Sequence, residues 1–124
     1  MAVILVVEDD EANGELVTRF LKRGHHTVIN ARDGVEGVAV ALAHSPDLIL
    51  MDLSLPRLDG WEATRRIRAN PVTAKVPIIA LTAHAHSEEV KRAMLAGCDQ
   101  YETKPVLYAR LMEKINELLS SSKV

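Results

Sequence analysis

The feature of this sequence that most constrains its fold is the regular alternation of short apolar runs with longer amphipathic segments along all 124 residues. The runs with strand length are Val3–Val7, Val28–Ala31, Leu48–Met51, Ile78–Leu81 and, more weakly, Gln100–Thr103. The first four are apolar on both faces, and a strand without polar alternation is covered on both sides, as in a parallel sheet flanked by helices. The pattern therefore predicts an α/β fold in which a doubly wound, five-stranded parallel sheet carries helices on both faces.

The segments between these runs have helical periodicity and typical helix-boundary residues. We expect Gly24 to end the first helix in the left-handed conformation. The second and third helices begin with capping-box pairs, Asp33 with Glu36 and Asp59 with Glu62. The markers of the fourth helix are Ser87 at its start and Gly97 at its end, and those of the fifth are Leu107, Leu111, Ile115 and Leu118.

Length, charge and cysteine content exclude several classes of protein. The chain has the size of one domain and no internal boundary, so we expect a single domain over residues 1–124 without an output domain. Lys and Arg number 15 against 17 Asp and Glu, and the absence of a basic stripe argues against nucleic acid as a partner. The apolar runs are far shorter than the roughly 18 residues of a membrane span. The single cysteine, Cys98, cannot form an internal disulfide, which suits a reducing compartment. Together these features predict a cytoplasmic protein that does not bind membranes.

Polar residues follow the apolar runs at the points where the expected strands end. Glu8 and Asp9 follow the first, Asp52 the third, Thr82 the fourth and Lys104 the fifth. In open α/β sheets this edge binds ligands. Each residue alone has an ordinary role as a turn or capping residue. Several carboxylates brought together would repel one another if no cation were bound. Oxygen ligands with open positions suit Mg²⁺, which would relieve this repulsion. The pattern predicts a site for magnesium and a phosphoryl group, without the glycine-rich loop of a P-loop protein.

Four motifs resemble the receiver domain of two-component response regulators, the CheY-like family. They are residues Ile4 to Asp10, Asp47 to Gly60, Ile79 to Ala83 and Tyr101 to Pro105. The resemblance covers nearly the whole chain and implies a flavodoxin-like sheet with strand order 2-1-3-4-5. It also implies a phosphorylation-dependent signalling switch that receives its phosphoryl group from a sensor histidine kinase or a histidine phosphotransfer protein.

The resemblance implies a role for each residue of the site. Asp52 would be the phosphoacceptor, a carboxylate nucleophile that forms an acyl phosphate. Glu8 and Asp9 would hold Mg²⁺ with Asp52 and the backbone carbonyl of Ser54, Asp9 directly and Glu8 through water. Lys104 would pair with a phosphoryl oxygen.

The resemblance also implies a switch. Thr82 would move to hydrogen-bond the phosphoryl group, and Tyr101 would turn inward when it does. The output surface for a downstream protein would then be formed by the fourth helix, fifth strand and fifth helix. Ser54 and His84 occupy the two positions that tune the lifetime of the phosphoryl group in the family.

Two other functions remain open at this point. A magnesium-dependent phosphatase that works through an aspartyl-phosphate has similar chemistry, but enzymes of the haloacid dehalogenase type have a second aspartate where this chain has Ser54. A flavodoxin-like FMN carrier is disfavoured by the acidic first loop and the scarcity of aromatic residues. We expect no enzymatic turnover beyond self-phosphorylation and autodephosphorylation.

The remaining residues of note are expected to be structural. The bond between Lys104 and Pro105 should be cis, as the family implies, and Pro56 and Gly60 should shape the loop after the acceptor. The side chains expected to face solvent are His25, His26, Arg65, Arg66 and Arg68, and those expected to pack in the interior are Met51 and Trp61.

Overall fold

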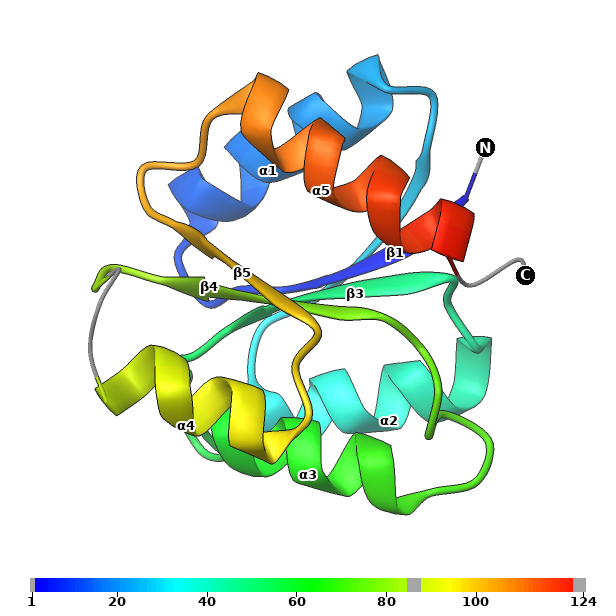
Figure 1. The fold of residues 1–124 in the computed structure, drawn as a ribbon, viewed down its shortest axis with the longest axis vertical. Helices are drawn as coiled ribbons and strands as arrows, with labels where there is room; N and C mark the ends of the chain where they lie inside the picture. The colour runs from blue at the N-terminus through cyan, green and yellow to red at the C-terminus, as the bar shows by residue number, and fades with distance from the viewer. Residues whose placement is uncertain (1, 85–87, 122–124) are drawn as a thin grey trace.

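The computed structural model describes residues 2–84 and 88–121, in which five strands and five helices alternate along the chain (Figure 1). The strands are β1 Val3–Val7, β2 Thr27–Ala31, β3 Leu48–Asp52, β4 Ile78–Thr82 and β5 Gln100–Thr103. The helices are α1 Glu11–Arg23, α2 Gly34–His44, α3 Gly60–Ala69, α4 Glu88–Ala96 and α5 Tyr108–Ser121. All five predicted strands are present, each within one residue of its predicted bounds.

The strands form one parallel sheet in the order β2-β1-β3-β4-β5. Helices α1 and α5 cover one face, and α2, α3 and α4 cover the other (Figure 1). This arrangement confirms the predicted doubly wound α/β fold and its strand order.

Two apolar layers enclose the sheet because successive side chains of a strand point to opposite faces. Residues such as Val6 and Leu50 pack against α1 and α5, whereas their neighbours Val7 and Met51 pack against α2 and α3. The strands β3 and β4 are buried at every position. Because both strands are buried, their last residues, Asp52 and Thr82, are held in fixed positions at the end of the sheet.

The second strand is less covered than its apolar sequence predicts. Thr27 and Asn30 are exposed, and Val28 and Ile29 are only partly buried. The prediction of full coverage is wrong here because β2 pairs with β1 alone and lies at the edge of the sheet.

Helices α2 and α3 begin where the capping pattern predicts. Asp33 Oδ1 accepts a hydrogen bond from the Glu36 N–H at 2.8 Å, and Asp59 Oδ1 accepts one from the Glu62 N–H at 2.9 Å. Gly97 ends α4 with a φ of 121°, as predicted. Ser87, the predicted cap of α4, lies outside the described residues.

Two details of the helix ends differ from the prediction. Gly24 has a φ of −82°, and the left-handed residue is His25, with a φ of 67°. The Gly24 N–H already bonds to the Phe20 carbonyl, so the chain reverses one residue later than expected. Leu107 precedes α5 and is half exposed, while Leu111 and Ile115 are buried.

Arg68 corrects the prediction that all three arginines of α3 face solvent. Arg65 and Arg66 do lie at the surface, but the guanidinium of Arg68 turns inward and pairs with Asp99 at 2.8 Å. It also donates hydrogen bonds of 2.6 to 3.1 Å to three backbone carbonyls, those of Ala74, Val76 and Gly97. These loop carbonyls lie outside the regular hydrogen bonding of helix and strand, and a planar guanidinium satisfies several of them at once.

Two further observations concern membrane-spanning segments and the single cysteine. Within residues 2–84 and 88–121, the helices are too short or too polar to cross a bilayer. Cys98 is buried and unbridged, and burial raises the pKa of its thiol to about 11, so the thiol is protonated at neutral pH.

Candidate functional site

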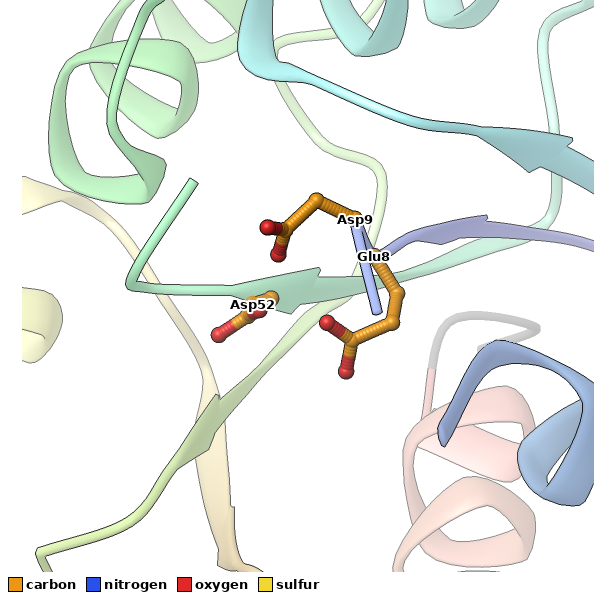
Figure 2. Close-up of side chains that lie close together, drawn as sticks. All are labelled: Glu8, Asp9 and Asp52. Atoms are coloured by element: carbon orange, nitrogen blue, oxygen red, sulfur yellow. The ribbon is translucent and has the colours of Figure 1, made fainter. Parts of the chain in front are cut away.

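The carboxylates of Glu8, Asp9 and Asp52 gather at the carboxyl edge of the sheet, where β1 and β3 end (Figure 2). One oxygen from each of the three residues lies within 4.8 Å of the other two. Two parallel neighbouring strands carry these residues, and the pairing of Val7 with Met51 brings the strand ends level. The structure therefore brings together the three acidic residues that the sequence pattern indicated.

Asp52 is held in place from two directions. Its side chain is only 3% exposed. One carboxylate oxygen accepts a hydrogen bond from the Ser54 N–H at 3.1 Å, and the other lies 3.2 Å from Lys104 Nζ. Both contacts fix the orientation of the carboxylate, a side chain that can act as a nucleophile.

Glu8 shares this ammonium group, with Oε1 at 3.1 Å from Lys104 Nζ. Burial, together with the neighbouring Asp52 carboxylate, raises the pKa of Glu8 to about 7, although Lys104 opposes the shift. Burial by itself would lower the pKa of Lys104, but the charges of Asp52 and Glu8 outweigh it and the pKa is raised. Lys104 is thus a fixed positive charge between two acids.

The cluster has the composition of a divalent cation site. Three carboxylates lie close together, the ammonium of Lys104 contacts those of Glu8 and Asp52, and Asp9 is exposed at the open side. Among the described residues, the buried Oε1 of Glu8 has no hydrogen-bond partner of regular geometry despite its ion pair with Lys104. Clustered oxygen donors with an open side suit Mg²⁺, which keeps several of its waters when bound.

Thr82 ends β4 next to the acidic cluster in the sheet and is 3% exposed. Its hydroxyl accepts a hydrogen bond from the His84 N–H at 3.1 Å. The same hydroxyl lies 3.4 Å from the His84 carbonyl and 3.4 Å from Glu89 Oε2 on α4. The sequence contains no signal for the Glu89 contact, because the two residues meet only when α4 packs beside β4.

Tyr101 lies on β5 and is partly buried against the α2, α3 and α4 side of the sheet. The ammonium of Lys114, from α5, lies 5.1 Å from the centre of its ring and donates to its backbone carbonyl. Lys114 also pairs at 3.1 Å with the buried Glu102. Strand β5 is therefore bound tightly to α5 just before Lys104.

The loops around the acceptor contain two expected features. The bond between Lys104 and Pro105 is cis, as predicted. A Cβ atom on Gly60 would lie 2.3 Å from the Asp52 carbonyl oxygen, so only glycine fits where α3 begins against the end of β3.

A sequence model of the response regulator receiver domain matches residues 4–116. The chain belongs to this family. It is a receiver domain, a phosphorylation-dependent signalling switch of two-component systems, and the comparisons do not support the phosphatase alternative.

Individual receivers resemble the chain over nearly its full length. The polar-differentiation response regulator DivK of Brucella anthropi is 34% identical over 119 residues, which cover 96% of this chain and 97% of DivK. The receiver domain of the sensor histidine kinase PA1611 of Pseudomonas aeruginosa is 37% identical, with a TM-score of 0.91 and coverage of 96% and 98%. That receiver was solved with a magnesium ion in its active-site cleft. The chemotaxis response regulator CheY4 of Vibrio cholerae is 25% identical, with a TM-score of 0.90 and coverage of 95% and 98%.

Proposed function

We propose that this receiver accepts a phosphoryl group on Asp52 from a phosphohistidine of a sensor histidine kinase or a histidine phosphotransfer protein. The observation that carries the proposal is the environment of the Asp52 carboxylate, which bonds to Ser54 and Lys104 beside the acids Glu8 and Asp9. In the reaction a carboxylate oxygen forms the bond to phosphorus, the phosphorus–nitrogen bond breaks, and the imidazole leaves with the electron pair.

The other residues of the site position and neutralise charge. Lys104 Nζ already contacts Asp52 and pairs with an oxygen of the incoming phosphoryl group. Glu8, Asp9, Asp52 and the Ser54 carbonyl would hold Mg²⁺. When bound, the cation neutralises the charge on the transferring phosphoryl group. The acid cluster and the magnesium-bound receiver of PA1611 support this assignment.

The signal passes from Thr82 and Tyr101 to the surface formed by α4, β5 and α5, where a downstream protein docks. In this proposal the chain acts as a single receiver domain in the cytoplasm. Its partner is a protein and not nucleic acid or a membrane. Ser54 and His84 set the lifetime of the phosphoryl group. Measuring the half-life of the phosphorylated His84→Ala variant tests the role of His84.

Acetyl phosphate and Mg²⁺ should add one phosphoryl group to the protein, and chelation of the metal should prevent it. Intact-mass measurement followed by peptide mapping should locate the group on Asp52. Modification of any other residue would contradict the proposal. A phosphomonoester such as p-nitrophenyl phosphate should not be turned over, and sustained release of nitrophenol would favour the phosphatase instead.

The metal-free protein should lose stability as the pH rises from about 4.5 to about 7. Glu8 keeps its proton up to about pH 7 in the folded protein but loses it near pH 4.5 when unfolded. The folded state then binds more protons in this window, so the free energy of unfolding falls with rising pH, by roughly 3 kcal/mol from this residue.

Urea unfolding in the presence of a chelator, at both ends of this pH window, measures the change. Glu8→Gln should show a smaller loss than the wild type, and equal losses would contradict the origin in Glu8. At neutral pH, Mg²⁺ at ten times its dissociation constant should stabilise the wild type by about 1.4 kcal/mol.

A further inference from the structure

Among the described residues, the hydroxyl of Thr82 has two competing acceptors for its one proton. It lies 3.4 Å from the His84 carbonyl and 3.4 Å from Glu89 Oε2. A hydroxyl donates a single hydrogen bond, and bonds to charged acceptors are stronger than bonds to neutral ones. The carboxylate of Glu89 is therefore the stronger acceptor and connects the end of β4 to the first turn of α4.

The first turn of α4 has a second attachment, on α3. Trp61 Nε1 donates a hydrogen bond to the Glu89 carbonyl at 3.2 Å. The guanidinium of Arg92, on the next part of α4, lies 4.1 Å from the centre of the Trp61 ring. Helices α3 and α4 lie side by side under the sheet (Figure 1). Glu89 thus joins α4 to α3 through its backbone and to Thr82 through its side chain.

We propose that Glu89 is a positioning residue that opposes the phosphorylated state by competing for the Thr82 hydroxyl. The inference rests on the proposed function, in which Asp52 carries the phosphoryl group. That group offers Thr82 a new charged acceptor, and because the hydroxyl has one proton, its bond to Glu89 must break. The added negative charge of the phosphoryl group also repels the Glu89 carboxylate. Phosphorylation then releases the start of α4 from β4 while Trp61 still holds it on α3.

Glu88 provides a matched control for this role. It is an exposed glutamate in the same first turn of α4. Both carboxylates interact favourably with the helix dipole, so their general electrostatic effect on α4 is similar. Of the two carboxylates, that of Glu89 contacts the Thr82 hydroxyl.

The test is a titration of the full chain with beryllofluoride in the presence of Mg²⁺. Beryllofluoride is a phosphoryl analogue that bonds to a carboxylate. Binding is followed by the fluorescence of Trp61, the only tryptophan of the chain. Glu89→Ala should lower the half-saturating concentration about threefold to tenfold, the factor that one hydrogen bond contributes to an equilibrium. Glu88→Ala should stay within about twofold of the wild type, and Glu89→Gln, which keeps an acceptor without charge, should fall between.

A double-mutant cycle separates competition for Thr82 from a general effect on the helix. In a Thr82→Ala background, Glu89→Ala should have no further effect. Equal effects of Glu89→Ala and Glu88→Ala, or an effect that persists without the Thr82 hydroxyl, would overturn the inference alone. Binding to Asp52→Asn as tight as to the wild type would overturn the phosphoacceptor assignment and the inference with it.

Discussion

Asp52→Asn is expected to abolish phosphorylation by acetyl phosphate, with the rate of labelling falling on the order of a thousandfold. The amide is nearly isosteric with the carboxylate, so β3 remains packed and an oxygen remains to accept the Ser54 N–H. The side chain loses the anionic oxygen that attacks phosphorus and the charge that faces Lys104 Nζ at 3.2 Å. Time courses of phosphoryl incorporation, measured by intact mass in the presence of Mg²⁺, give the rate.

Asp10→Asn is the matched control for this substitution. Asp10 follows the acid pair directly but serves as the N-cap of α1, where its Oδ1 accepts a hydrogen bond from the Asn13 N–H at 3.0 Å. Asparagine caps a helix as well as aspartate does, so α1 should remain intact and labelling should continue. Labelling of Asp52→Asn at the rate of Asp10→Asn would refute the assignment of the phosphoacceptor.

Gly60→Ala is expected to reduce the free energy of unfolding by about 3 kcal/mol. The new Cβ atom would lie 2.3 Å from the Asp52 carbonyl oxygen and 2.8 Å from the Leu53 Cα atom. Both are backbone atoms, which cannot turn aside as a flexible side chain can. Either α3 or the end of β3 has to move, so the orientation of the Asp52 carboxylate should change as well. Urea unfolding measures the stability, and the acetyl phosphate reaction measures the effect on the site.

Gly14→Ala tests whether any added methyl group near the site has this effect. Gly14 lies inside α1, and the nearest atom to its Cβ position is Glu8 Cγ at an ordinary contact distance of 3.8 Å. Alanine there should stabilise the helix by about 0.5 to 1 kcal/mol because it has less backbone freedom when unfolded. Similar stabilities for the two variants would show that the close approach of Gly60 to β3 does not exclude a side chain at position 60.

The order of elements was predictable because it depends on local patterns. Runs such as Leu48–Met51 are too short and too apolar for surface helices, and the pairs beginning at Asp33 and Asp59 mark helix starts by their own backbone hydrogen bonds. The gathering of Asp52 with Glu8 also follows from the pattern, since parallel strands bring their carboxyl ends to one edge. The strand order and the implied roles of the site residues came from the family resemblance.

Other features could not be predicted because they depend on neighbours far away in the sequence. The inward turn of Arg68 requires the carbonyl of Gly97, which is 29 positions away. The exposure of Asn30 depends on β2 having a single neighbouring strand.

The sequence by itself determined that this chain is a (βα)5 receiver with acidic, hydroxyl and lysine side chains at the ends of its strands. Only the tertiary structure decided how these side chains are partnered: Lys104 between Glu8 and Asp52, and Thr82 against Glu89. The physical reason is the range of the interactions. Hydrophobic periodicity and capping act between residues a few positions apart, whereas hydrogen bonds and ion pairs within a site depend on distances of about 3 Å that packing alone sets.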